Sequence, residues 1–102
     1  MNRYELTKEA LGDIDELWLY IAEDNIEAAI RVSDAILDAC DLLAEQPQVG
    51  HTRADLTERP VLFWPSGKYL IVYRPDTKPL RIIAVFHSSR DVATLLSDRA
   101  EG

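Results

Sequence analysis

The chain has 102 residues, of which 47% are hydrophobic and 28% charged, and these values predict a single domain, residues 1–102, with one hydrophobic core. Eighteen acidic and eleven basic residues leave a formal net charge of -7, which argues against binding of nucleic acid through a global positive field. A lone cysteine excludes an internal disulfide, and no spacing of Cys and His residues fits a metal site, so we expect no metal or cofactor. No apolar run is long enough for a signal peptide or a membrane span, so we expect a cytoplasmic protein.

The charge is divided unevenly along the chain. Residues 1–46 hold three basic and twelve acidic side chains, a balance of -9, whereas residues 47–102 have a balance of +2. Such an asymmetry is typical of two layers with different neighbours, although acidic helices that simply face water produce the same pattern.

Apolar periodicity predicts a helical hairpin in the first half of the chain. Thr7 provides a hydroxyl N-cap, and apolar residues at three- and four-residue steps predict a helix that runs to about Asp24. Asn25 is a second N-cap, and a second helical period continues to near Glu45. The short link between the helices implies an antiparallel pair. Cys40 lies on the inner stripe of the second helix and is expected to be a buried small hydrophobe, not a nucleophile.

The second half of the chain is predicted to form a sheet and a short helix. Polar residues without a period predict an exposed loop at 51–60. β-Branched and aromatic residues predict three strands in an antiparallel meander, and a last helix is predicted at 90–99, with Ser88 or Ser89 as its cap. The three strands are expected at 61–64, 69–74 and 80–87, after an extended N-terminal stretch at 3–6. The predicted fold class is therefore α+β: an N-terminal strand, a helical hairpin, a three-stranded antiparallel sheet and a short C-terminal helix.

The last two predicted strands are apolar on both faces. Strict alternation over 80–87 assigns its even-numbered residues to one face and its odd-numbered residues to the other, and both sets are mainly apolar. The helical hairpin can cover one face of the sheet. The other is either closed by the terminal helix acting as a lid, or left partly open for a partner protein.

Four segments carry a resemblance to a known family. They are YIAEDNIEAA at 20–29, EQPQVGHTR at 45–53, GKYLIVYR at 67–74 and IIAVFHSSRD at 82–91. In this order, and over nearly the whole chain, they resemble the ParE/RelE superfamily of toxins from type II toxin–antitoxin systems, and the ParE branch most.

The resemblance implies a function and leaves alternatives. A ParE-like toxin is expected to inhibit DNA gyrase by binding, to arrest growth, and to be neutralised in a complex with its cognate antitoxin. The RelE branch instead cleaves mRNA on the ribosome. A non-toxic family member that only binds its antitoxin is a third alternative.

A ribonuclease would need an acid–base group and cations around one phosphate. The candidates are Arg74, Arg81, His87 and Arg90, and whether they share a face depends on strand register. Basic residues are scattered here where RelE-like enzymes are dense in lysine and arginine, and the last strand lacks the tyrosine that some of the nucleases place at its end. We therefore expect a binding inhibitor that is not an enzyme.

The candidate antitoxin-binding residues are apolar positions on the predicted sheet. Phe63 and Trp64 end a strand beside Pro65, so one of the two aromatic rings is expected to point away from the core and to anchor a bound segment. The remaining candidates are Leu70, Val72, Ile83 and Val85.

Overall fold

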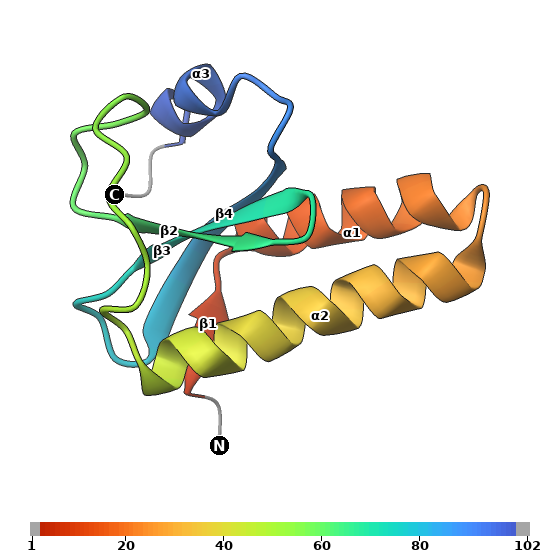
Figure 1. The fold of residues 1–102 in the computed structure, drawn as a ribbon, viewed down its shortest axis with the longest axis horizontal. Coiled ribbons are helices and arrows are strands. Elements are labelled where there is room, and N and C mark those ends of the chain that lie inside the picture. The colour runs from red at the N-terminus through yellow and green to blue at the C-terminus, as the bar shows by residue number, and fades with distance from the viewer. Residues whose placement is uncertain (1–2, 100–102) are drawn as a thin grey trace.

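The computed structural model describes residues 3–99 and has the predicted α+β architecture (Figure 1). The elements are β1 (Tyr4–Leu6), α1 (Lys8–Ala22), α2 (Ile26–Glu45), β2 (Leu62–Ser66), β3 (Tyr69–Arg74), β4 (Leu80–His87) and α3 (Val92–Ser97). The sheet order is β1-β4-β3-β2, with β1 parallel to β4 and the other neighbours antiparallel. The N-terminal strand thus joins the predicted three-stranded meander as a fourth strand. None of the helices within residues 3–99 is long and apolar enough to cross a membrane.

The helical hairpin forms where the caps predict it. The Thr7 hydroxyl accepts a hydrogen bond from the backbone N–H of Ala10 at 3.1 Å, and the Asn25 side chain accepts one from Ala28 at 3.0 Å. These bonds satisfy N–H groups that have no partner within a first helical turn. The two helices pack side by side, and their connected ends project beyond the sheet (Figure 1).

β3 and β4 have the predicted bounds, and β2 is shifted relative to the prediction. It begins one residue later than expected and includes Pro65, which is tolerated because β2 is an edge strand. Gly67 begins the two-residue turn to β3 with φ 60°, a conformation that strains other residues and that primed hairpin turns need.

A β-bulge in β4 overturns the strict alternation expected for this strand. Val72 pairs with Ala84, but the next residue, Tyr73, pairs with Ile82, so Ile83 is an extra residue in the ladder. The bulge shifts every later side chain of β4 to the opposite face. Leu80, Ile82 and Val85 consequently pack on the helical hairpin, whereas Ile83, Ala84 and Phe86 pack on the other face.

Each face of the sheet has its own core. The first core lies under α1 and α2, and the second lies under α3, which therefore acts as the lid that the doubly apolar strands require. The 51–60 loop also contributes, because Leu56 packs against the second core, so this loop is less exposed than expected. The N-cap of α3 is Asp91 and not Ser88 or Ser89, since the Asp91 carboxylate accepts from the Thr94 backbone N–H at 3.3 Å.

A buried tyrosine attaches the end of α2 to the sheet. The Tyr73 hydroxyl donates to the Pro47 carbonyl at 2.7 Å and accepts from the Gly50 N–H at 3.0 Å. A Cβ at position 50 would lie 2.5 Å from the Tyr73 hydroxyl oxygen, so only glycine permits this approach. Burial raises the pKa of Tyr73, and the hydroxyl stays protonated as a donor at neutral pH.

Cys40 is fully buried in the first core, as predicted. Burial raises the pKa of its thiol to about 12, with the nearby Asp41 charge adding to the effect. A thiol is nucleophilic only as the thiolate, so Cys40 acts as a packing residue.

Candidate functional site

A cavity of about 720 Å³ opens between α1, the end of β4 and α3, and we call it the α1–β4 groove. Its apolar wall is formed by Leu17, Val85, Phe86 and Leu95, and two tyrosines, Tyr20 and Tyr69, stand at its sides. His87 and Arg90 line the end of the groove that follows β4. Asp13, Glu16 and Arg99 also line it, so the groove combines apolar side chains with charged ones. Apolar side chains with a few placed polar groups are a common form of binding site.

The groove follows the part of β4 that β1 does not cover. β1 pairs only with residues 80–82 of β4, and the last backbone bond at this edge runs from the Thr7 N–H to the Ile82 carbonyl at 3.1 Å. β4 continues to His87, so residues 83–87 form an edge without a neighbouring strand. Such an edge needs other partners for its N–H and C=O groups.

An ion pair supplies those partners at the bulge. Asp13 accepts from the Val85 N–H at 3.0 Å, and Arg99 donates to the Ile83 carbonyl at 2.8 Å. Asp13 and Arg99 also bind each other at 2.7 Å, and both side chains are about 85% shielded from solvent. We call this arrangement the Asp13–Arg99 clasp. It closes the strand edge and holds the segment after α3 against α1.

Sequence reasoning did not identify either residue of the clasp. Asp13 was one of several acids on α1, although its position four residues before the buried Leu17 places both on one side of that helix. Arg99 is also fixed by its guanidinium over the Phe86 ring at 4.9 Å and by a hydrogen bond from Arg59 to its carbonyl. The four-residue spacing between Asp13 and Leu17 was therefore the one sequence signal for the clasp, and no such signal indicated Arg99.

Two of the predicted site residues meet at the end of the groove. The rings of His87 and Tyr69 lie nearly perpendicular with 5.2 Å between their centroids, and Nδ1 of His87 accepts from the Ser89 N–H at 3.1 Å. Arg90 is exposed beside them. Burial raises the pKa of Tyr69, and the nearby Tyr20 hydroxyl adds to this rise. This end of the groove thus combines the protonated Tyr69 hydroxyl with the exposed cation of Arg90.

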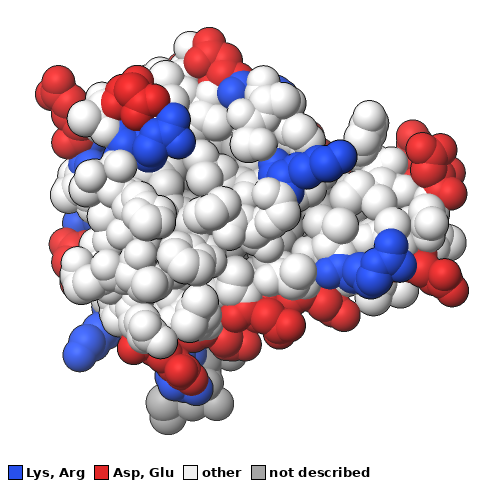
Figure 2. All heavy atoms as spheres, viewed as in Figure 1, with Lys and Arg blue, Asp and Glu red and all other residues white. Residues whose placement is uncertain are grey.

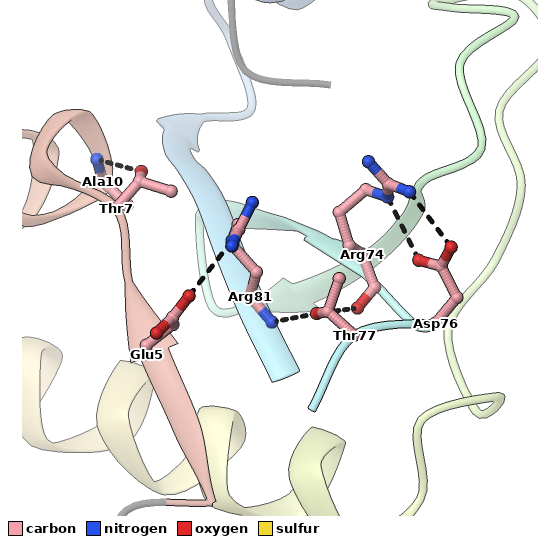
Figure 3. A network of polar contacts seen from close by, with 7 residues as sticks. All are labelled: Glu5, Thr7, Ala10, Arg74, Asp76, Thr77 and Arg81. Carbon is pink, nitrogen blue, oxygen red and sulfur yellow. Dashed lines mark hydrogen bonds and ion pairs between the residues drawn. The ribbon is translucent and has the colours of Figure 1, made fainter. Parts of the chain in front are cut away.

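The other two candidates lie at the opposite end of β4 and are engaged by acids (Figure 3). Arg74 forms two parallel bonds to Asp76 at 3.1 and 3.0 Å, and these bonds lower the pKa of Asp76. Arg81 forms an ion pair with Glu5 of β1 at 3.1 Å, and its backbone N–H donates to the Thr77 hydroxyl at 2.9 Å. The two arginines pair across β3 and β4.

The four nuclease candidates therefore form two separate pairs. Arg81 and His87 are six positions apart in β4, which is about 20 Å along a strand. The bulge also shifts the parity between them, so Arg81 and His87 do not share a face as strict alternation predicted. One phosphate cannot contact all four side chains in this arrangement.

Most of the predicted antitoxin-binding residues lie inside the domain. Phe63, Leu70, Val72 and Ile83 belong to the second core under α3. Val85 belongs to the first core and also lines the α1–β4 groove.

Trp64 retains more surface than the other predicted residues. It is half-buried against the first core, and its ring stacks on His51 with centroids 6.0 Å apart. Phe63 and Trp64 thus point to opposite faces of the sheet, but each ring packs against a core. A role of these residues in binding an antitoxin stays a prediction.

Comparison with other proteins places this small α+β protein in a known class. Residues 4–92 match the family described as ParE toxin of type II toxin-antitoxin system, parDE. A relative from Sinorhizobium fredii (strain NBRC 101917 / NGR234), named "Putative toxin Y4kP", is 36% identical over 88 residues, which is 85% of this chain and 88% of the relative. The fold is similar to a chain in the structure titled "Chromosomal ParDE TA system from P. aeruginosa", with a TM-score of 0.66 and 19% identity over 82% of this chain and 92% of that chain.

The protein belongs to the ParE toxin family of type II toxin–antitoxin systems. The match covers β1 through the start of α3, and therefore includes the groove residues of α1 and β4 but not Leu95 and Arg99.

Proposed function

We propose that this ParE-family toxin arrests growth by binding DNA gyrase in the cytoplasm, and that a cognate antitoxin neutralises it by forming a complex with it. The observation that supports a binding mechanism is the separation of the nuclease candidates into two pairs. In one pair, Arg74 and Arg81 are each bound by a carboxylate. A convergent cluster of base and cations is what phosphodiester cleavage requires.

We propose the α1–β4 groove as the antitoxin-binding site. Leu95 and Tyr69 are partly exposed in it and Tyr20 is 77% exposed, whereas Leu17 and Val85 lie almost fully buried behind this surface. Arg90 offers an exposed cation to a carboxylate. The segment that fits this surface carries apolar anchors and an acidic residue near the end of β4. Of the residues predicted from sequence, Val85 lines the groove but is only 3% exposed, and half-buried Trp64 is a separate contact on the hairpin side of the sheet.

The target is tested with purified toxin in two assays side by side. We expect toxin to block supercoiling of relaxed plasmid by gyrase, to leave transcripts intact in a translation extract, and to lose its effect when the small protein encoded beside it is added. Expression without that protein should arrest growth. Normal supercoiling at a stoichiometric excess of toxin would contradict the gyrase target, and cleaved transcripts would establish the RelE-like alternative.

The groove is tested by charge reversal at its rim. We expect Arg90→Glu to weaken antitoxin binding at least about tenfold, because it replaces an attractive partner by a like charge, a change of about 1.4 kcal/mol or more. Isothermal titration calorimetry measures the affinity. Lys78→Glu is the matched control, since Lys78 is exposed in the β3–β4 turn at the other end of the sheet. Equal affinities for the two variants would show that the antitoxin binds elsewhere.

A further inference from the structure

The connected ends of α1 and α2 carry large apolar side chains that are exposed. Leu19 is 64% exposed and Tyr20 77% in the last turn of α1, and Ile26 is 59% exposed and Ile30 46% at the start of α2. We call these four residues the hairpin tip. In Figure 1 this end of the hairpin extends away from the sheet, and neither core includes these four residues.

The exposure of the hairpin tip is not needed for folding. The helices bury other residues, such as Ala10, Leu17 and Ala29, and the positions of the hairpin tip would be occupied at least as well by polar side chains. Single exposed apolar residues are common, but four within twelve residues of one hairpin form the kind of surface that binds another protein.

The surroundings of the hairpin tip are strongly acidic. Residues 15–34 hold six acidic side chains and one basic side chain, and Figure 2 shows acidic groups around the outer end of the hairpin. Glu23 and Asp24 follow the last turn of α1, where no basic residue is present and where the helix dipole disfavours negative charge. The chain thus keeps carboxylates at a position that does not favour its own stability.

The charge determines what kind of partner fits. A second copy of the chain would bring the same carboxylates to the interface, and like charges would oppose the contact. A cationic partner with apolar contacts matches both features of the hairpin tip. An enzyme that binds DNA has such a surface, because it must neutralise phosphates with lysine and arginine.

We propose that the hairpin tip is the surface by which the toxin docks on the cationic DNA-binding surface of its topoisomerase target. This inference rests on the proposed function and adds the part of the toxin and the part of the target that meet. Leu19, Ile26 and Ile30 supply the apolar contacts, and the surrounding carboxylates take positions that DNA phosphates otherwise occupy. Tyr20 belongs to both the hairpin tip and the α1–β4 groove, so an antitoxin in the groove covers one side of the docking surface.

The test compares apolar truncations at two places on the same hairpin. The double variant Leu19→Ala/Ile26→Ala truncates side chains that are 64% and 59% exposed and that belong to neither core, so it should fold normally by circular dichroism. We expect the concentration for half-inhibition of gyrase supercoiling to rise at least about tenfold. Leu11→Ala is the control, since Leu11 is 49% exposed but lies in the first turn of α1, near the sheet. Affinity for the antitoxin should stay within about twofold in both variants.

The charge component is tested by Glu23→Lys/Asp24→Lys. We expect this variant to inhibit gyrase more weakly than the wild type, and its inhibition to depend less on salt concentration. We also expect the wild-type toxin to inhibit gyrase less when the enzyme is first mixed with excess linear DNA.

Equal inhibition of gyrase by the wild type and by Leu19→Ala/Ile26→Ala would overturn the docking surface and leave the gyrase target intact. Failure of the wild type to inhibit gyrase would overturn both. A wild-type dimer in sedimentation that Ile26→Ala dissociates would show that the hairpin tip pairs with itself and would also overturn the proposal.

Discussion

Replacing Asp13 by alanine is expected to cause a large loss of stability. The variant leaves the largely buried Arg99 guanidinium without its carboxylate and the Val85 N–H without its acceptor. Removal of one partner of a buried ion pair costs about 3 kcal/mol or more. For a domain of this size the midpoint of thermal unfolding should fall by more than about 10 °C, as measured by calorimetry.

Two further variants separate the charge of Asp13 from its hydrogen bonds. Asp15→Ala removes an exposed acid from the same helix, and its effect should stay within about 0.5 kcal/mol. Asp13→Asn keeps an acceptor for the Val85 N–H and should cost less than alanine. If Asp13→Ala unfolds at the wild-type temperature, the Asp13–Arg99 clasp does not hold the edge of β4.

Removing the Tyr73 hydroxyl is the second change with a large expected effect. Tyr73→Phe leaves the Pro47 carbonyl and the Gly50 N–H without their common partner in a part-buried site. Loss of hydrogen bonds to groups that stay buried costs about 1–3 kcal/mol, and urea unfolding should show this decrease with an unchanged m-value. The expected cause is a looser attachment of the end of α2, because residues 47–50 connect α2 to the loop before β2.

A double-mutant cycle identifies the contact responsible. Gly50→Ala alone should destabilise by about 1–3 kcal/mol, since the new methyl group would lie 2.5 Å from the Tyr73 hydroxyl oxygen. In the Tyr73→Phe background that oxygen is absent, so the same substitution should cost less. Additive effects of the two substitutions would indicate that Gly50 is required for a reason other than this contact.

The Asp13–Arg99 clasp and the Tyr73 contact both support the surfaces that we propose for binding. The Asp13–Arg99 clasp forms one wall of the α1–β4 groove, and the Tyr73 contact holds α2 against the first core. The hairpin tip is carried by the same two helices. The stability of these contacts therefore sets the position of the two surfaces that we propose for the antitoxin and the target.

Local sequence signals determine where most helices and strands of this protein form. The hydroxyl of Thr7 and the amide of Asn25 start the two helices at the predicted residues, since a cap depends only on the first helical turn. β3 and β4 have the predicted bounds because their β-branched and aromatic residues, with turn residues on either side, are a local signal. The burial of Cys40 follows from helical periodicity alone.

The tertiary structure alone decided how the strands combine and where the sites lie. The parallel pairing of β1 with β4 and the bulge at Ile83 depend on register between segments far apart in the chain, which no local pattern contains. The bulge changed the faces of the later residues of β4 and separated Arg81 from His87, and α3 buried most of the predicted binding residues. The Asp13–Arg99 clasp joins residues 86 positions apart, and it forms only because folding places α1 beside the uncovered edge of β4.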